Sequence, residues 1–282
     1  MTRILVLGGT GMLGVPAARR LRADGFAVRV MARDPDKAAG MLGEGVEVVA
    51  GDVANLTSLE AALDGCEGAH ISVGGAVDQI SAENVAALVP RLGLERITYL
   101  SGSTVSEQNR WFPTIEQKLR AEQAIQGCGV PYTILCPTWP MEQLPRFVMG
   151  GRAAIWGEQP TPIHWFAAED LATTVSHAYQ REGAANKRLF VHGPEAIRMH
   201  EALERYCQAL QPEIEAVAVV PIDAARAMAA SSGNEMLKYF AELMAYFDQV
   251  GELGDPAQGN QIRGAPATKL DAWIQQRGDA GS

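Results

Sequence analysis

Three glycines near the start of the chain have the spacing of a phosphate-binding turn. Gly8, Gly11 and Gly14 follow the apolar run Ile4–Leu7 and open a segment of helical character. In such a turn the first glycine makes the tight bend, the second leaves room for a pyrophosphate, and the third lets helix and strand pack closely. The helix N-terminus adds N–H groups and a favourable dipole for negative charge. The pattern predicts a dinucleotide site rather than a plain strand–helix junction, and we assign to it Gly8, Thr10 (as a hydroxyl donor), Gly11, Met12, Leu13 and Gly14.

The residue that ends the second apolar run indicates which dinucleotide is bound. NAD-binding units usually place Asp or Glu there, where the carboxylate binds the ribose 2′-hydroxyl. This chain has Ala32 followed by Arg33. A guanidinium would instead pair with a 2′-phosphate through charge-assisted hydrogen bonds. We therefore expect NADP(H) as the cofactor, with NAD as the alternative if Arg33 is only a solvated loop charge.

Two later turns are expected at the same edge of the fold. Asp52 follows the third apolar run, where it would either bond the adenine amino group or cap a helix beginning near Asn55. Val73 and Gly74 end the fourth run, and a glycine there lets the backbone lie close to a cofactor ribose. A plain loop is the alternative for this last turn.

Alternating strands and helices must position these turns. Residues 1–136 contain six short, nearly continuous apolar runs separated by helix-like segments, a pattern typical of βαβ units with a parallel sheet covered on both faces. We predict an α/β fold with a doubly wound parallel (Rossmann) sheet. The expected strands are Ile4–Leu7, Ala27–Met31, Val46–Ala50, Ala69–Val73, Ile97–Leu100 and Tyr132–Cys136, and the expected helices are Gly11–Ala23, Leu56–Leu63, Ile80–Leu92 and Ile115–Gln126.

Prolines and glycines interrupt this alternation after Cys136. Residues 137–282 are expected to form mainly a smaller α+β substrate lobe, with some elements returning to the core. Helices are predicted at Glu169–Gln180, Met199–Leu210, Ala224–Ala230, Asn234–Phe247 and Lys269–Gln276, and strands at Arg188–Val191 and Glu215–Val220. The polar, glycine-rich stretch Gly251–Gly264 is expected to be a loop.

Composition restricts the partners. The formal net charge of −9 argues against a nucleic-acid binder, which would usually carry a basic face. No stretch approaches the roughly 20 apolar residues of a membrane span, and the first apolar run is too short for a signal peptide, so we expect a cytoplasmic monomer or homodimer. The four cysteines form no C-x-x-C pair, and His177, His192 and His200 share no ligand spacing. We therefore expect reduced thiols and no metal.

Several motifs taken together resemble one family. The glycine pattern G-G-T-G-x-x-G is joined by "YLSGS" ending at Ser103, "KLRAEQAIQGCGVPYTILCP" from Lys118, "HWFAAEDLATTVSHAY" from His164, "LFVHGPEAIRMHEAL" from Leu189 and "GAPATKLDAWI" from Gly264. This combination resembles the NmrA-like group of atypical short-chain dehydrogenase/reductases. The resemblance implies NAD(P) at the carboxyl edge of the sheet and a substrate lobe formed by the C-terminal half.

The resemblance also implies catalytic roles. Active short-chain dehydrogenases use a Tyr-x-x-x-Lys pair and a serine, but in the window "TIEQK" Thr114 replaces the tyrosine while Lys118 is retained. Ser103, or Thr104 beside it, matches the serine. The isoflavone- and lignan-reductase relatives lack the tyrosine and use a lysine followed thirteen positions later by "PYT", a spacing that Lys118 reproduces. Lys118 is thus expected to assist protonation or hold the ribose; a surface pair with Glu122, one helical turn on, is the alternative.

The expected activity is NAD(P)H-dependent hydride transfer to a small carbonyl or quinone-like substrate. Aromatic and apolar residues in loop-like stretches suggest a pocket for an aromatic compound: Trp111, Phe112, Trp139, Met141 and Trp156, with His164, Trp165 and Phe166 either joining it or packing in the core. The missing tyrosine leaves a second possibility, a non-enzymatic redox sensor that binds NAD(P) and acts through a protein partner.

Overall fold

The chain forms two compact units, and the computed structural model describes residues 1–281. The first unit contains Met1–Pro137, Ala168–Val191 and Asp255–Ala265. The second contains Thr138–Ala167, His192–Gly254 and the chain from Pro266 onward. The backbone therefore passes between the units several times.

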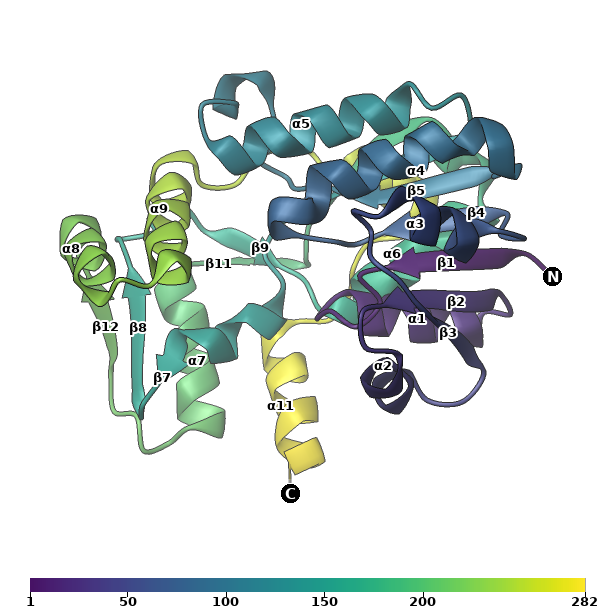
Figure 1. The fold of residues 1–282 in the computed structure, drawn as a ribbon. Coiled ribbons are helices and arrows are strands. Elements are labelled where there is room, and N and C mark those ends of the chain that lie inside the picture. Colours follow the sequence, from purple (N-terminus) through teal and green to yellow (C-terminus); the bar gives the residue numbers. More distant parts are fainter. Residues whose placement is uncertain (282) are drawn as a thin grey trace. The chain divides into compact units, whose positions relative to one another are not determined.

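A seven-stranded parallel sheet forms the centre of the first unit (Figure 1). Its strand order is β10-β6-β5-β4-β1-β2-β3, and every neighbouring pair is parallel. The order runs outward from β1 in both directions, as in a doubly wound sheet. The strands are β1 (Arg3–Leu7), β2 (Ala27–Ala32), β3 (Val46–Ala50), β4 (Gly68–Ile71), β5 (Arg96–Leu100), β6 (Tyr132–Pro137) and β10 (Lys187–Val191). The predicted α/β fold class is confirmed.

Helices cover both faces of this sheet. The helices of the first unit are α1 (Gly14–Ala23), α2 (Pro35–Leu42), α3 (Leu56–Leu63), α4 (Asp78–Leu92), α5 (Pro113–Gln126), α6 (Ala168–Gln180) and α10 (Ala257–Arg263). Helix α4 packs against α3 and α5, whereas α1 packs against α6. Because side chains alternate along a strand, Leu5 and Leu7 join the core cluster that includes Leu59 and Val85, while Ile4 and Val6 are buried outside that cluster.

The predicted elements of the first half correspond closely to the structure, with shifts at their ends. Helix α1 begins at Gly14 instead of Gly11, because Gly11–Leu13 form the turn. Strand β4 ends at Ile71 instead of Val73. Helix α2 was not predicted; it has only eight residues and begins with Pro35, after the capping side chain of Asp34.

Two later segments of the chain, Ala168–Val191 and Asp255–Ala265, belong to the first unit. Strand β10, predicted as part of the smaller lobe, pairs in parallel with β6, and α6 packs on α1. The prediction of a loop at Gly251–Gly264 was wrong in part, because α10 occupies Ala257–Arg263. Tertiary contacts stabilise this polar helix: Arg263 is only 2% exposed and donates hydrogen bonds to the carbonyl of Phe190 and to Thr174 Oγ1. Burial lowers the pKa of Arg263 to about 10.

The second unit has two small sheets and a helical layer. One sheet has the order β12-β8-β7, and the other pairs β9 with β11 in antiparallel register. Its core contains Leu144, Ile155, Trp165, Leu203 and Trp273. The elements are β7 (Val148–Met149), β8 (Arg152–Trp156), β9 (Ile163–Trp165), β11 (Glu195–Ile197), β12 (Val217–Val220), α7 (Met199–Leu210), α8 (Ile222–Ser232), α9 (Glu235–Val250) and α11 (Leu270–Gly281).

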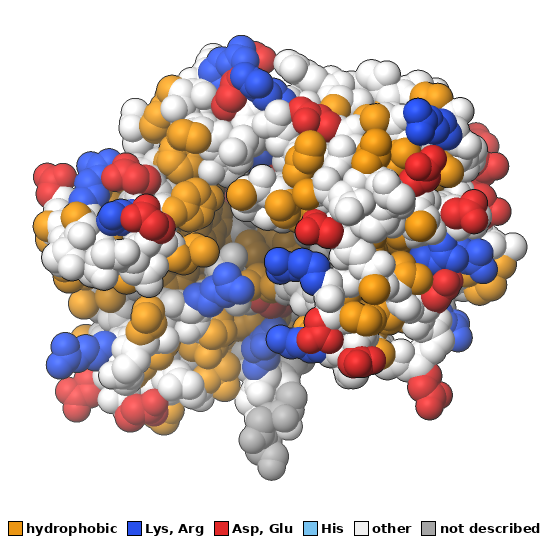
Figure 2. Space-filling model, in the orientation of Figure 1, with side chains coloured by type: hydrophobic (Ala, Val, Ile, Leu, Met, Phe, Trp, Pro, Cys, Tyr) orange, Lys and Arg blue, Asp and Glu red, His pale blue; other side chains and the backbone are white. Residues whose placement is uncertain are grey.

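Surface charges, helix hydropathy and the state of the cysteines can be read from the structure. On the face shown in Figure 2, acidic and basic side chains are interspersed. None of the described helices is long and apolar enough to cross a membrane. All four cysteines are free thiols, and Cys66, Cys136 and Cys207 are buried.

Candidate active site

The three glycines of the turn between β1 and α1 differ in what surrounds them. Gly8 has φ +79°, a conformation that favours glycine, and an added Cβ would lie 2.3 Å from the carbonyl oxygen of Ser72. At Gly14 an added Cβ would lie 2.0 Å from the carbonyl oxygen of Gly8, so only glycine permits this approach of helix and strand. An added Cβ at Gly11 would approach only that same oxygen, at 3.2 Å. Packing therefore explains Gly8 and Gly14, and the space at Gly11 is available to a ligand.

The N-terminus of α1 is open to an anion. No side chain caps the helix at Leu13, and its first turn contains no acidic residue. The first N–H groups of a helix lack intrahelical partners, and together with the helix dipole they bind phosphate well. Met12 and Leu13, both half-buried, follow Gly11 in this turn. The turn thus fits a dinucleotide pyrophosphate.

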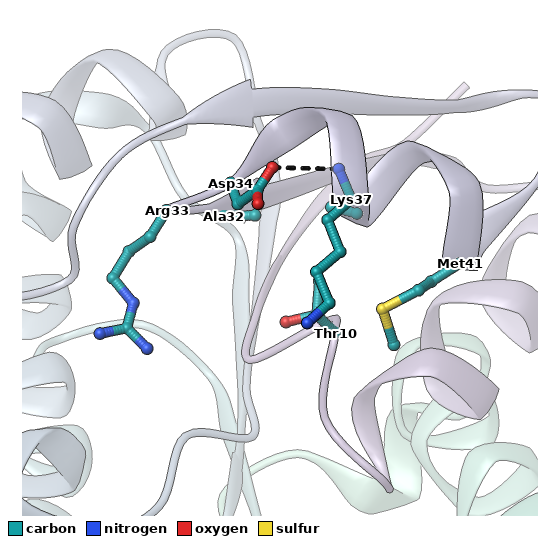
Figure 3. Close-up of a pocket in the computed structure, with 7 residues that line it drawn as sticks. Thr10, Ala32, Arg33, Asp34, Lys37 and Met41 are labelled. Carbon is teal, nitrogen blue, oxygen red and sulfur yellow. Dashed lines mark hydrogen bonds between the residues drawn. The ribbon is translucent and has the colours of Figure 1, made fainter.

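A cavity of about 460 Å³ lies beyond the end of β2 and carries two basic side chains, Arg33 and Lys37 (Figure 3). Asp34 accepts a hydrogen bond from the backbone N–H of Lys37 at 3.1 Å, which fixes the first turn of α2. The Lys37 side chain then extends toward Thr10, while Arg33 points away from it. Both side chains are exposed. The cavity lining also includes the Asp34 carboxylate, which is bonded to the Lys37 N–H. The two cations and the Thr10 hydroxyl suit a phosphate monoester.

A second cavity of about 240 Å³ connects the turns at the ends of β1, β2, β3 and β4. It is lined by Gly8, Thr10, Met31, Ala32, Arg33, Gly51, Asp52, Val53, Ala54, Val73 and Val77. The interpretation of Asp52 as the cap of α3 is wrong, because Asn55 caps that helix and accepts from Ser58 N at 3.0 Å. Asp52 instead accepts from the N–H of Ala54 at 2.9 Å. At Gly74 an added Cβ would meet no atom within 4 Å.

Lys118 on α5 is held at the carboxyl end of β5. Its Nζ donates to Asp78 Oδ2 at 2.6 Å and to the carbonyl oxygen of Leu100 at 3.2 Å. The Asp78 side chain is only 3% exposed, and that of Lys118 is 17% exposed. Tyr99 donates to the other carboxylate oxygen of Asp78 at 3.0 Å, and the lysine ammonium lies 5.4 Å from the centre of its ring. Sequence reasoning missed both Asp78 and Tyr99.

Tyr99 cannot serve as the missing catalytic phenol. Its side chain is fully buried, and burial together with the neighbouring Asp78 carboxylate raises its pKa far above the ordinary value. Its hydroxyl is also committed to Asp78. The tyrosine therefore orients the carboxylate that holds Lys118.

The surface pair proposed between Lys118 and Glu122 does not form. Glu122 is buried, accepts from Arg188 Nε at 2.9 Å, and accepts a short hydrogen bond from the Ser101 hydroxyl. Since Glu122 is occupied by these two groups, Lys118 reaches the opposite way, to Asp78.

The other predicted catalytic residues lie near the same strand end or on the same helix. Ser103 and Thr104 are buried just after β5, and the Ser103 N–H donates to the carbonyl of Pro137 at 2.9 Å. Thr114 lies in the first turn of α5, one helical turn before Lys118, and is half-buried.

The aromatic and apolar residues that were predicted to line a pocket are divided between the two units. In the first unit Trp111 is 54% exposed and Phe112 is buried. In the second unit Trp139 makes edge contacts with Trp165 and Phe247, at centroid distances of 6.1 and 4.8 Å. Trp156 and Phe240 form a further pair at 5.0 Å. Met141 and Phe166 are buried.

Comparison with known proteins identifies the family to which the chain belongs. Residues 8–147 match the model of an NAD(P)H-binding family. A reductase of Streptomyces griseus that acts on (4-alkanoyl-5-oxo-2,5-dihydrofuran-3-yl)methyl phosphate is 30% identical over 203 residues, which cover 70% of each protein. The chain belongs to the NmrA-like NAD(P)H-binding family. Its cofactor is accordingly NAD(P)(H).

Solved structures with the same fold match almost the whole length of the chain. The NADP(H) complex of triphenylmethane reductase from Citrobacter sp. has a TM-score of 0.79 and 21% identity, and covers 97% of this chain and 99% of its own. The NADPH complex of quinone oxidoreductase QOR2 from Escherichia coli has a TM-score of 0.78 and 20% identity, with the same coverage. At these identities the likeness shows the fold, and both of these solved structures contain a nicotinamide cofactor.

Proposed function

We propose that this NmrA-like protein is an NADPH-dependent reductase that passes hydride to a small, conjugated carbonyl or quinone-like compound. The observation that carries the proposal is the placement of Lys118 Nζ, which Asp78 and the Leu100 carbonyl hold at the carboxyl end of β5. Ligands of open α/β sheets bind outside this end of the strands.

The preference for NADPH rests on the cavity at the end of β2. Ala32 supplies no carboxylate for a ribose 2′-hydroxyl, and Arg33 and Lys37 supply two cations. An acidic residue at this position would repel a 2′-phosphate, whereas these side chains attract it. Arg33 also lines the neighbouring cavity of Asp52 and Val53, so it is placed between the proposed phosphate and adenine sites.

Lys118 is the proposed proton donor. When bound, the reduced nicotinamide supplies the hydride. The Lys118 ammonium has three N–H donors, of which one points to Asp78 and one to the Leu100 carbonyl. The third is available to a substrate oxygen or a ribose hydroxyl. Ser103, buried just after the same strand, would orient the substrate oxygen.

The acceptor class follows from what the site lacks. Thr114 occupies the position of the family's phenol, and a threonine hydroxyl is a very weak acid. Acceptors whose reduced form spreads its negative charge over a conjugated system need less help from a proton donor. The named substrates of relatives place little demand on a proton donor. The oxo-dihydrofuran with an alkanoyl group and the quinone can spread the negative charge of their reduced form, and a triphenylmethane dye is a cation that hydride neutralises.

A direct assay tests the proposal. The purified protein is mixed with NADPH or NADH and a panel of quinones, conjugated enones and triphenylmethane dyes, and loss of reduced-nicotinamide absorbance is followed. We expect turnover with at least one acceptor class and a higher kcat/KM with NADPH. Tight binding of NADPH with no turnover on any acceptor would contradict the reductase proposal and favour the redox-sensor alternative.

A further inference from the structure

Three side chains from distant parts of the second unit meet at one point. His164 lies on β9, His192 follows β10, and Glu252 follows the end of α9. One ligand atom from each lies within 4.8 Å of the other two. The Nδ1 atoms of His164 and His192 are 2.6 and 3.4 Å from the same carboxylate oxygen, Glu252 Oε1. None of the three residues is given a role in the proposed reductase reaction.

The hydrogen bonds of His192 and Glu252 orient their ligand atoms inward. His192 Nε2 is 3.2 Å from the carbonyl oxygen of Leu253, which only accepts, so Nε2 carries the proton. In the neutral ring Nδ1 then presents a lone pair toward Glu252 Oε1. The second carboxylate oxygen, Oε2, accepts from the His164 backbone N–H at 2.7 Å. A cation between this lone pair and the carboxylate oxygen would bind to both.

Two glycines make this close approach of segments possible. An added Cβ at Gly193, next to His192, would lie 1.6 Å from the carbonyl oxygen of Trp165. Gly251, next to Glu252, has φ +67°, and its added Cβ would lie 2.4 Å from Thr161 Oγ1. Only glycine fits either position. The His164 carbonyl also accepts from the Gly193 N–H at 3.1 Å and from the Thr138 hydroxyl.

We propose that His164, His192 and Glu252 bind a divalent transition-metal ion, with Zn²⁺ as the best match. Two imidazoles and one carboxylate form a known zinc ligand set, which leaves a fourth position for water. With bonds of about 2.0–2.1 Å, tetrahedral ligand atoms are roughly 3.3 Å apart. His192 Nδ1 and Glu252 Oε1 have nearly this separation already, at 3.4 Å. His164 Nδ1, now 2.6 Å from Glu252 Oε1, must move outward by about 0.7 Å to reach this separation, and it must exchange any Nδ1 proton for the metal.

The surroundings supply an outer shell and an entrance. Ligand histidines usually donate their other N–H to a carbonyl or a carboxylate, as His192 does to Leu253. The side chains of His192 and Glu252 are 5% and 10% exposed, whereas that of His164 is 38% exposed. A metal ion would reach the cluster from the side of His164. Once bound, it would join β9, the turn at Gly193 and the end of α9.

The ligand spacing explains why the sequence did not indicate this site. His164 and His192 are 28 positions apart, and Glu252 follows 60 positions later. Short ligand motifs that place two ligands on one helix or turn are absent. The expectation of no metal considered His177, His192 and His200, of which only His192 belongs to the cluster.

Titration of the full-length protein with metal tests the site. After treatment with EDTA and its removal, the protein is titrated with Zn²⁺ in calorimetry and with Co²⁺ under visible spectroscopy. We expect one Zn²⁺ per chain, a higher temperature of unfolding, and Co²⁺ d–d bands without the near-ultraviolet charge-transfer absorption of a thiolate ligand. His164→Gln and Glu252→Gln should weaken Zn²⁺ binding at least about 10–100-fold, since even outer-shell changes have that effect.

The matched control is His200→Gln, which removes a histidine of the same unit that bonds Val217 and lies outside the cluster. It should bind Zn²⁺ as the wild type does. Far-ultraviolet circular dichroism and NADPH affinity verify that each variant is folded. Absence of stoichiometric Zn²⁺ binding by the wild type would overturn the proposal, whatever the variants do. So would Zn²⁺ binding that survives both cluster substitutions in folded protein, or a thiolate signature with Co²⁺.

Discussion

Lys118 Nζ and Asp78 Oδ2 are 2.6 Å apart, although they lie 40 positions apart in the chain, on α5 and α4. The Asp78 carboxylate is almost fully buried and also accepts from Tyr99. A buried carboxylate requires such partners, because an unpaired charge in the interior costs several kcal/mol. The ion pair therefore fixes the ammonium at the strand end with little freedom to turn away.

Lys118→Met should separate chemistry from cofactor binding. The substitution retains the apolar stem and removes the ammonium. If Lys118 donates the proton, kcat should fall by about 10²–10⁴-fold, the usual contribution of general acid–base catalysis. Steady-state kinetics with the best acceptor measures this. Lys238→Met is the matched control, since Lys238 pairs on the surface with Glu235 in its own helix. Equal kcat for both variants would exclude Lys118 as the donor.

Asp78→Asn should destabilise the fold and impair turnover together. The amide still accepts from Tyr99, but it cannot neutralise Lys118. The loss of one charged, buried hydrogen bond should lower the free energy of unfolding by about 1.5–3 kcal/mol, measured by urea unfolding. Asp223→Asn, on the surface of α8, is the control and should change stability very little. An Asp78→Asn variant with wild-type stability would show that the pair is not needed to hold Lys118.

Arg33→Ala and Lys37→Ala should each reduce the preference for NADPH. A charged hydrogen bond to the 2′-phosphate contributes about 1.5–3 kcal/mol, so the ratio of NADPH to NADH affinity should fall roughly 10–100-fold for the stronger contact. Binding of NADH should hardly change, because it lacks the phosphate. Calorimetry with both cofactors measures the difference. Equal affinity of the wild type for NADPH and NADH would contradict the predicted role of both residues.

Gly11→Val should lose cofactor binding, whereas Gly14→Ala should lose stability. The first places a branched side chain in the space available for the pyrophosphate and should abolish cofactor binding in a folded protein. The second forces Cβ to within 2.0 Å of the Gly8 carbonyl oxygen, so the backbone itself must shift and stability should fall. Unfolding temperature and NADPH affinity distinguish the two. A folded Gly11→Val variant with wild-type affinity would place the phosphate site elsewhere.

His70 should make the protein acid-sensitive. The ring lies in β4 with Nδ1 2.7 Å from Thr98 Oγ1, and burial lowers its pKa to about 4. An unfolded chain protonates this histidine near pH 6.5, whereas the native state remains neutral until about pH 4. Its contribution to stability is therefore complete above pH 6.5 and is lost as the pH falls to 4, by roughly 3 kcal/mol at about 1.4 kcal/mol per pH unit.

The comparison with His70→Gln isolates this effect. Glutamine keeps a polar group near Thr98 and does not titrate in this range. Urea unfolding of both proteins at a series of pH values should give curves that converge by about 3 kcal/mol between pH 6.5 and 4. Parallel curves would mean that His70 is not buried as a neutral ring.

The sequence predicted the fold best for strands that are buried on both faces of the sheet. Strands such as β1 and β6 are continuous apolar runs because helices cover the sheet on both sides, and their predicted bounds differ from the structure by a residue or less. Helix α10 was not readable, because its sequence is polar and its stability depends on Arg263 reaching Phe190. Contacts between residues more than 70 positions apart leave no periodic signal in either segment.

The site was readable only in part for the same reason. The glycine turn and Lys118 are local motifs, so their spacing identified them. Asp78 and Tyr99 matter because the sheet brings α4, α5 and β5 together, and nothing in either sequence neighbourhood distinguishes them. Lys37 had a local signal, since it lies four positions after Arg33, but the helix that carries it was not predicted.

The burial of Arg263 in the first unit limits how the protein can be truncated or recombined with its relatives. The residues that complete the nucleotide-binding unit are encoded after most of the second unit, since Asp255–Ala265 follows Gly254. A truncation before Asp255 would remove more than the distal part of the second unit. It would also leave the Phe190 carbonyl and the Thr174 hydroxyl without the guanidinium that contacts them. Exchange of substrate specificity between relatives by swapping C-terminal halves should therefore fail, whereas grafts that retain α10 in place should fold.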